Sequence, residues 1–161
     1  MKEFIYLETS IFSFYYDTRS APSIVARREW TQTWWNTYKP LYVIMTSTAV
    51  YDELRRENKP HKDQALALAL TVPAVNPTDA ISEIVQVYVK HYLMPNDPIG
   101  DALHLALASY HKCDYLLTWN CEHLANAHKF AHIRRINTLL GLHVPELVTP
   151  LALMGEDTNE R

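Results

Sequence analysis

The chain has 161 residues, of which 48% are hydrophobic and 20% charged, and this composition excludes a disordered or collagen-like protein. Its formal charge of −3 argues against a broadly basic nucleic-acid coat, although a local basic groove remains compatible with it. The glycines, Gly100, Gly141 and Gly155, are too far apart for a dinucleotide-binding loop, a P-loop or a nucleophile elbow. Cys113 and Cys121 form no disulfide framework, which is typical of a reducing compartment.

Residues 1–75 alternate short apolar runs with segments of helical spacing. Residues 4–7 are aromatic and β-branched, and they predict a buried strand that ends at Glu8. The next predicted elements are a helix starting at Thr9 and Ser10, a helix over 24–38, a strand over 41–45, a short helix capped by 46–48, a helix over 64–70 and a short strand at 74–75. Pro40 and Pro60 end the helices before them, because proline breaks a helix.

Residues 76–161 continue this alternation. The predicted elements are a helix starting at 77–79, a helix over 98–111, a strand over 115–118, a helix over 122–140 and a last strand over 144–148. Strands separated by helices call for a parallel sheet covered on both faces, so we expect one α/β domain over 1–150. Residues 151–161 are expected to be a polar C-terminal tail.

The segment 1–8 turns acidic too early for a signal peptide. The longest apolar run, 65–75, is too short to cross a bilayer. We therefore expect a cytoplasmic protein without a membrane partner.

Polar side chains follow two of the predicted strands, at the edge where an open parallel sheet holds its functional crevice. Glu8 ends the first strand, and Asn120 closes the segment after the fourth. Asp101 lies on the packed side of its helix, and Glu53 lies in another helix. Buried carboxylates are costly unless they are paired or bound to a metal, and a hard divalent cation is the usual remedy for several of them.

Four segments resemble, in order, the motifs of the PIN-domain nucleases, and among these the toxins of bacterial toxin–antitoxin systems. They are 7–10 (LETS), 48–54 (TAVYDEL), 101–106 (DALHLA) and 117–120 (LTWN). The resemblance covers the chain from Phe4 to about Pro150 and implies a PIN-like doubly wound parallel sheet with helices on both faces. It also implies a ribonuclease dependent on Mg²⁺ or Mn²⁺, which hydrolyses single-stranded or looped RNA and is restrained by a cognate antitoxin.

By matching motif, the resemblance implies catalytic roles for Glu8, Glu53, Asp101 and Asn120, and metal binding by the three carboxylates. Glu8 stands where the family usually has aspartate, and Asn120 where a fourth aspartate is common. Three carboxylates favour one resident ion, with a second ion arriving with the phosphate. The supporting candidates are Thr9, Thr118 and Glu122.

Other side chains have competing interpretations. The candidate phosphate contacts are Arg55, Arg56, Arg134 and Arg135, which a solvated face explains equally well. The Cys and His residues between 113 and 132 match no familiar zinc pattern, and His104 is expected to be a hydrogen-bonded core residue. The tryptophans at 30, 34 and 35 are expected in the core or in the contact of a homodimer, with base stacking as the alternative.

Two further functions fit the pattern. One is a non-catalytic PIN-like module that binds RNA or a protein partner and carries a degenerate acidic site. The other is a small-molecule phosphohydrolase, which is disfavoured because 8–10 (ETS) lacks the paired aspartates such enzymes carry after the first strand. Metal-dependent turnover separates the enzyme from the module, and preference for RNA over nitrophenyl phosphate separates the nuclease from the phosphatase.

Overall fold

The computed structural model describes residues 1–91, 98–120 and 127–155. Within these ranges the strands form one parallel sheet in the order β3-β2-β1-β4-β5. The strands are β1 (Phe4–Leu7), β2 (Val43–Ser47), β3 (Ala74–Val75), β4 (Tyr115–Leu117) and β5 (Glu146–Val148). β1 lies at the centre, where Tyr6 is in register with Met45 of β2 and with Leu116 of β4.

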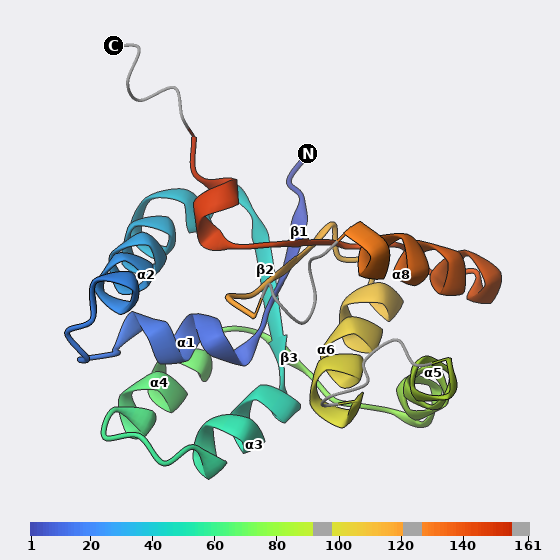
Figure 1. The fold of residues 1–161 in the computed structure, drawn as a ribbon, viewed down its shortest axis with the longest axis horizontal. Coiled ribbons are helices and arrows are strands. Elements are labelled where there is room, and N and C mark those ends of the chain that lie inside the picture. The colour runs from blue at the N-terminus through green and yellow to red at the C-terminus, as the bar shows by residue number, and fades with distance from the viewer. Residues whose placement is uncertain (92–97, 121–126, 156–161) are drawn as a thin grey trace.

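Helices cover both faces of this sheet (Figure 1). One face carries α1 (Thr9–Tyr15), α3 (Thr48–Arg56) and α4 (Lys62–Ala69), and α2 (Pro22–Thr33) packs against α1 on the same side. The other face carries α5 (Asp79–Lys90), α6 (Pro98–Tyr110) and α8 (Ala127–Leu140). Among the described residues, no helix is both long and apolar enough to cross a membrane.

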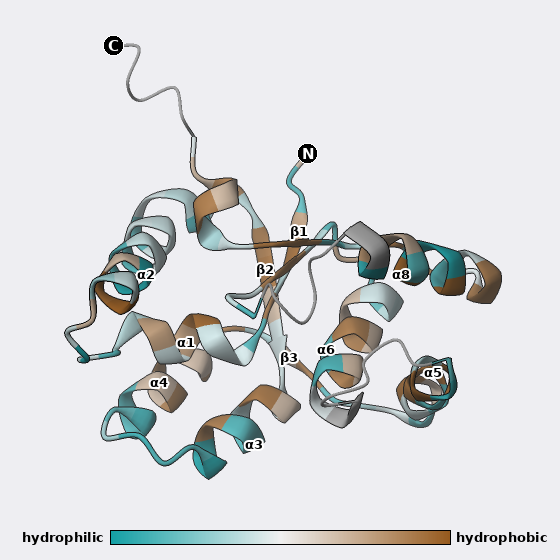
Figure 2. Ribbon diagram, viewed as in Figure 1, coloured by the Kyte–Doolittle hydropathy of each residue, from teal (hydrophilic) through white to brown (hydrophobic). Residues whose placement is uncertain are grey.

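The alternation of side chains along each strand divides the core into two layers. Ile5 and Leu7 of β1 are buried with α1, α3 and α4, whereas Tyr6 between them is buried with α5, α6 and α8. Figure 2 shows the central strands largely in the hydrophobic colour, as expected for a parallel sheet that is buried on both faces. Glu8, directly after β1, is the first charged residue beyond this buried strand.

Several element boundaries differ from the prediction. The second strand begins at Val43 because Lys39–Leu41 forms a 3₁₀ turn, and the strand runs on to Ser47. Thr46 is buried there and donates its Oγ1 to the carbonyl of Leu7 at 2.9 Å, so it does not cap the next helix. The helix predicted over 24–38 starts at Pro22 and changes at Trp34–Tyr38 into a π-helical turn, where Trp34 is fully buried.

The C-terminal part of the chain also differs in detail. The helix predicted over 122–140 is described from Ala127 to Leu140, and 121–126 lies outside the described residues. The predicted tail is structured at its start, because Pro150–Leu153 forms a 3₁₀ turn. Leu153 and Met154 pack against the layer formed by α1–α4, so the packed structure extends beyond residue 150.

Candidate functional site

An open pocket of about 420 Å³ lies beside the start of α1, beyond the carboxyl ends of β1 and β4. The predicted residues Glu8, Glu53, Asp101 and Asn120 all line it. The remaining described lining residues are Thr9, Ser10, Ser13, Phe14, Arg56, Glu57 and Lys59. Topology thus gathers at one sheet edge the acidic residues that are far apart in the sequence.

Glu8 is held by the structures on either side of it. Its N–H continues the strand pairing by donating to the carbonyl of Leu117 at 3.1 Å, while its side chain caps α1. Glu8 Oε1 accepts from the Ser10 N–H at 3.0 Å, from Ser10 Oγ at 2.5 Å and from Thr118 Oγ1 at 2.7 Å. Glu8 as a residue is only 4% exposed, and these hydrogen bonds offset the cost of burying its charge.

Asn120 is exposed and reaches Glu8 from the turn after β4. Its Nδ2 donates to Glu8 Oε2 at 3.3 Å, and its N–H donates to Thr118 Oγ1 at 2.9 Å. In the same turn the Trp119 N–H donates to Ser10 Oγ at 2.9 Å. The turn after β4 and the cap of α1 are therefore one connected hydrogen-bond network centred on Glu8.

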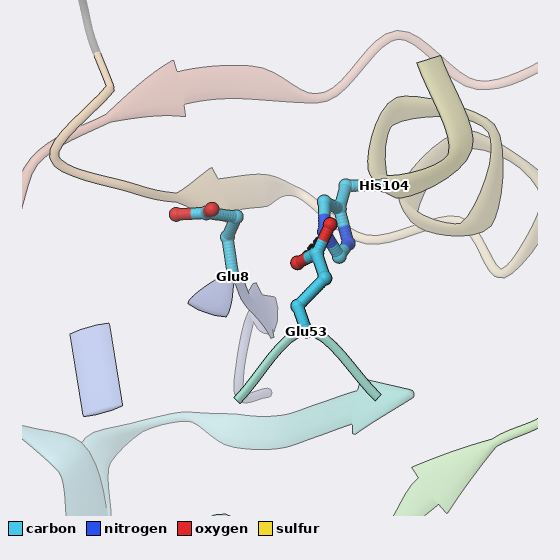
Figure 3. A group of neighbouring side chains, drawn as sticks. All are labelled: Glu8, Glu53 and His104. Carbon is cyan, nitrogen blue, oxygen red and sulfur yellow. Dashed lines mark hydrogen bonds and ion pairs between the residues drawn. The ribbon is translucent and has the colours of Figure 1, made fainter. Parts of the chain in front are cut away.

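Glu53 enters the pocket from α3 and points toward His104 of α6 (Figure 3). Its Oε1 accepts from Thr9 Oγ1 and from His104 Nε2, the latter at 2.8 Å. Partial burial acts to raise the pKa of Glu53, but the hydrogen bond and positive charge of His104, with the Thr9 bond, outweigh it and lower that pKa. Glu53 is therefore ionised at neutral pH.

His104 is a site residue that the sequence reasoning assigned only to the core. It is buried and hydrogen-bonded, as expected, and it links Glu53 to a chain of buried hydroxyls. Its Nδ1 lies 2.7 Å from the Tyr6 hydroxyl, which lies 2.7 Å from Ser47 Oγ. Burial alone would lower the pKa of His104, but the hydrogen bond and charge of Glu53, with the charges of Glu8 and Asp101, raise it. The available signal in the sequence was that His104 follows Asp101 by three positions, because residues three apart on a helix are neighbours.

Glu8, Glu53 and His104 each offer one ligand atom, and these atoms lie within 4.8 Å of one another. Asp101 lines the same pocket one helical turn before His104, and its negative charge contributes to raising the pKa of that histidine. Carboxylate oxygens around an open pocket suit a hard divalent cation, which takes oxygen ligands. The donor set therefore fits such an ion.

Glu57 and Lys59 also line the pocket, and the sequence reasoning did not identify either one. Ser13 Oγ donates to Glu57 Oε1 and Oε2 at 2.8 and 3.0 Å, and Lys59 Nζ lies 3.8 Å from Oε1. Glu57 follows Glu53 by four residues, a spacing that keeps two side chains on one side of a helix. This spacing was the available signal, but the same pattern occurs on any charged helix.

Of the candidate phosphate contacts, Arg56 lines the pocket and is exposed. Arg55 is not among the lining residues and lies 3.3 Å from Asp52. Arg134 and Arg135 line a separate hollow on α8. Glu122 lies outside the described residues, as do Cys121 and His123 of the unmatched zinc pattern, and the buried Cys113 contacts Met45 instead.

No family model matches the sequence. No curated protein matches it either. The fold is similar to that of VapC20 of Mycobacterium tuberculosis, a sarcin-ricin loop cleaving toxin, with a TM-score of 0.55 and 20% sequence identity. The similarity covers 70% of this chain and 86% of VapC20. At this identity it shows the fold, and the predicted PIN-like parallel sheet is confirmed.

Proposed function

We propose that the protein is a PIN-domain endoribonuclease that cleaves single-stranded or looped RNA with Mg²⁺ or Mn²⁺. We further propose that it is the cytoplasmic toxin of a toxin–antitoxin pair. The observation that carries the proposal is the convergence on one open pocket of Glu8 from the cap of α1, Glu53 from α3 and Asp101 from α6. The fold similarity to an RNA-cleaving toxin supports the same class of reaction.

The hydrogen bonds of the two glutamates support their proposed role as metal ligands. Most of the hydrogen bonds that Glu8 accepts, and both of those that Glu53 accepts from described residues, end on the Oε1 atom. Within the described part of the chain, the 3.3 Å contact from Asn120 to Glu8 is the one hydrogen bond to an Oε2 atom of these two glutamates. An ion held by these second oxygens and Asp101 would supply an activated water and stabilise the charge that develops on the phosphate.

The protein's own groups position the carboxylates and the substrate in this proposal. His104 holds Glu53 in place by donating a hydrogen bond to Oε1, and Thr118 does the same for Glu8. Arg56 lies exposed on the lining of the pocket, where its guanidinium can contact a backbone phosphate. Positive charge at that place also reduces the repulsion between the acidic pocket and an incoming RNA.

The test is cleavage of an RNA with a single-stranded loop by purified protein in Mn²⁺, in Mg²⁺ and in chelator. We expect cleavage only with metal, and loss of cleavage in Asp101→Asn with its fold retained. Equal cleavage by both proteins would identify a contaminating nuclease and refute the proposal. RNA binding without turnover would indicate the non-catalytic module, and turnover of nitrophenyl phosphate in preference to RNA would indicate a phosphatase. Co-purification with the product of an adjacent reading frame tests the antitoxin.

A further inference from the structure

An aromatic–guanidinium cluster adjoins the acidic pocket, and the metal chemistry does not account for it. We define the cluster as Phe14, Arg27, Trp30 and Trp119. Phe14 belongs both to the lining of the pocket and to the cluster, where its ring centroid lies 6.1 Å from that of Trp119. Trp119 also directly precedes Asn120, which lines the pocket, so the cluster lies directly beside the pocket.

The two tryptophans of the cluster differ in what they expose. Trp30 of α2 and Trp119 are stacked, with centroids 6.1 Å apart and planes 24° apart. Trp119 is buried, and its Nε1 donates to Thr31 Oγ1 at 2.8 Å, which fixes its ring. Trp30 is 37% exposed, so part of this residue meets solvent although its ring stacks with that of Trp119. A partly exposed indole on a fixed support is a platform for a planar group.

Arg27 supplies a cation to the same cluster. Its guanidinium carbon lies 5.7 Å from the ring centroids of Phe14 and of Trp119. Among the described residues, no carboxylate forms an ion pair with Arg27, so its charge is held against aromatic faces and is available to an anion. Arg56 and Lys59 from α3 and the segment after it line the pocket as well. The acidic centre thus has basic groups on both the α2 and the α3 sides.

We propose that this cluster is a nucleobase subsite of the substrate cleft, in which one base of a single-stranded RNA stacks on Trp30 and Arg27 contacts the adjoining phosphate. The inference rests on the proposed ribonuclease function, because it places one base of that substrate beside the acidic pocket. A single strand is the fitting ligand, since bases in a duplex already stack on each other. Stacking on an indole is tolerant of sequence because every base has a π-face.

The test measures binding and cleavage separately. Binding of a labelled single-stranded RNA oligonucleotide is measured in chelator, and cleavage of the same RNA in Mn²⁺. We expect Trp30→Ala to raise Kd and KM roughly five- to a hundredfold, the usual effect of removing one stacking partner, with kcat unchanged. Trp30→Phe should restore most of the affinity, and Arg27→Gln should weaken binding and reduce its salt dependence.

Lys39→Ala is the matched control, because Lys39 Nζ lies over the Trp35 ring at 4.6 Å but Lys39 does not line the acidic pocket. Its RNA affinity should equal that of the wild type. Equal RNA affinity of wild type, Trp30→Ala and Arg27→Gln overturns the subsite. If Trp30→Ala changes the oligomeric state instead of the RNA affinity, Trp30 belongs to a contact between copies of the chain. RNA binding that depends on Trp30, without any cleavage, would support the subsite and refute the nuclease function. Cleavage with an unchanged KM in Trp30→Ala would support the nuclease function and refute the subsite.

Discussion

His104 Nε2 lies 2.8 Å from Glu53 Oε1, so helix α6, which carries Asp101, also positions the carboxylate that α3 supplies. The two residues are 51 positions apart in the chain, and the contact couples two of the proposed metal-binding elements directly. Because both nitrogens of the imidazole are engaged, His104 orients Glu53 from one side and is itself oriented by Tyr6 from the other.

His104→Leu removes this support, and we expect it to lower kcat or metal affinity by about 10–100-fold, the usual cost of losing a residue that orients a metal ligand. His104→Gln can place an amide N–H near the position of Nε2, so it should retain most of the activity. Steady-state kinetics over a range of Mn²⁺ concentrations measures both variants. Equal loss in the two would indicate that the imidazole has a role other than donating to Glu53.

Divalent metal should raise the melting temperature of the wild type, because a ligand that binds only the folded state stabilises it by RT ln(1 + [L]/Kd), or ~2.7 kcal/mol at a hundredfold excess over Kd. Glu8→Gln and Glu53→Gln should reduce this gain. The control is Glu146→Gln, because Glu146 is exposed at the amino end of β5, away from the pocket. Paired melting curves with Mn²⁺ and with chelator give the gain, and a full gain in both site variants would locate the metal elsewhere.

Asn120→Asp should act in opposite directions with and without metal. In the metal-free protein the variant replaces the 3.3 Å contact from Nδ2 to Glu8 Oε2 by two facing carboxylates, and we expect a loss of about 1 kcal/mol because the position is exposed. With Mn²⁺ the added charge should tighten binding. Calorimetric titration and melting curves measure the two effects. If neither changes, Asn120 acts only as a turn residue.

Acid sensitivity should depend in part on Asp17, which is 1% exposed and accepts from Arg19 Nη2 at 2.6 Å. The hydrogen bonds and charge of Arg19 lower the pKa of Asp17 from 3.8 to about 2, against the opposing effect of burial. A folded-state pKa below the unfolded one stabilises the protein above the unfolded value, and this stabilisation is lost as pH falls from about 4 to about 2. Asp17→Asn should be less stable at neutral pH, by at most about 1 kcal/mol since Arg19 is exposed.

The control for this pH effect is Asp63→Asn, because Asp63 is exposed in the first turn of α4. Between pH 4 and pH 2, the difference in stability between wild type and Asp17→Asn should narrow. Melting temperatures across this range measure it. A difference that stays constant would mean that Arg19 does not stabilise the ionised form of Asp17.

The order of strands and helices was predictable because the periodicity of apolar residues is a property of short sequence segments. The strand at residues 4–7 and the helix start at Asp79 are examples. The π turn at Trp34–Tyr38 was not predictable, since it accompanies the burial of Trp34 by distant elements. The bounds of β2 were not predictable from its composition either, because the 3₁₀ turn at Lys39–Leu41 precedes it and its last residues, Thr46 and Ser47, pair with β3.

The acidic residues of the site could be proposed from four motifs in order, and the structure brings Glu8, Glu53, Asp101 and Asn120 to one pocket. Their chemical roles stay predictions. The sequence could not reveal the His104–Glu53 contact or the stacking of Trp30 on Trp119, because both depend on how separate elements pack. The placement of Arg134 at a separate hollow could not be predicted either, since a basic pair on a helix resembles a phosphate site wherever the helix lies.

The alternation of β1 links correct folding to the presence of a working site. A shift of β1 by one position against β2 and β4 would move Tyr6 into the layer that now holds Ile5 and Leu7, away from His104 and Ser47. The same shift would withdraw Glu8 from the cap of α1 and from Thr118. A chain that pairs its central strand wrongly would therefore lack the assembled acidic centre, so under the proposed function a misfolded molecule would not cleave RNA.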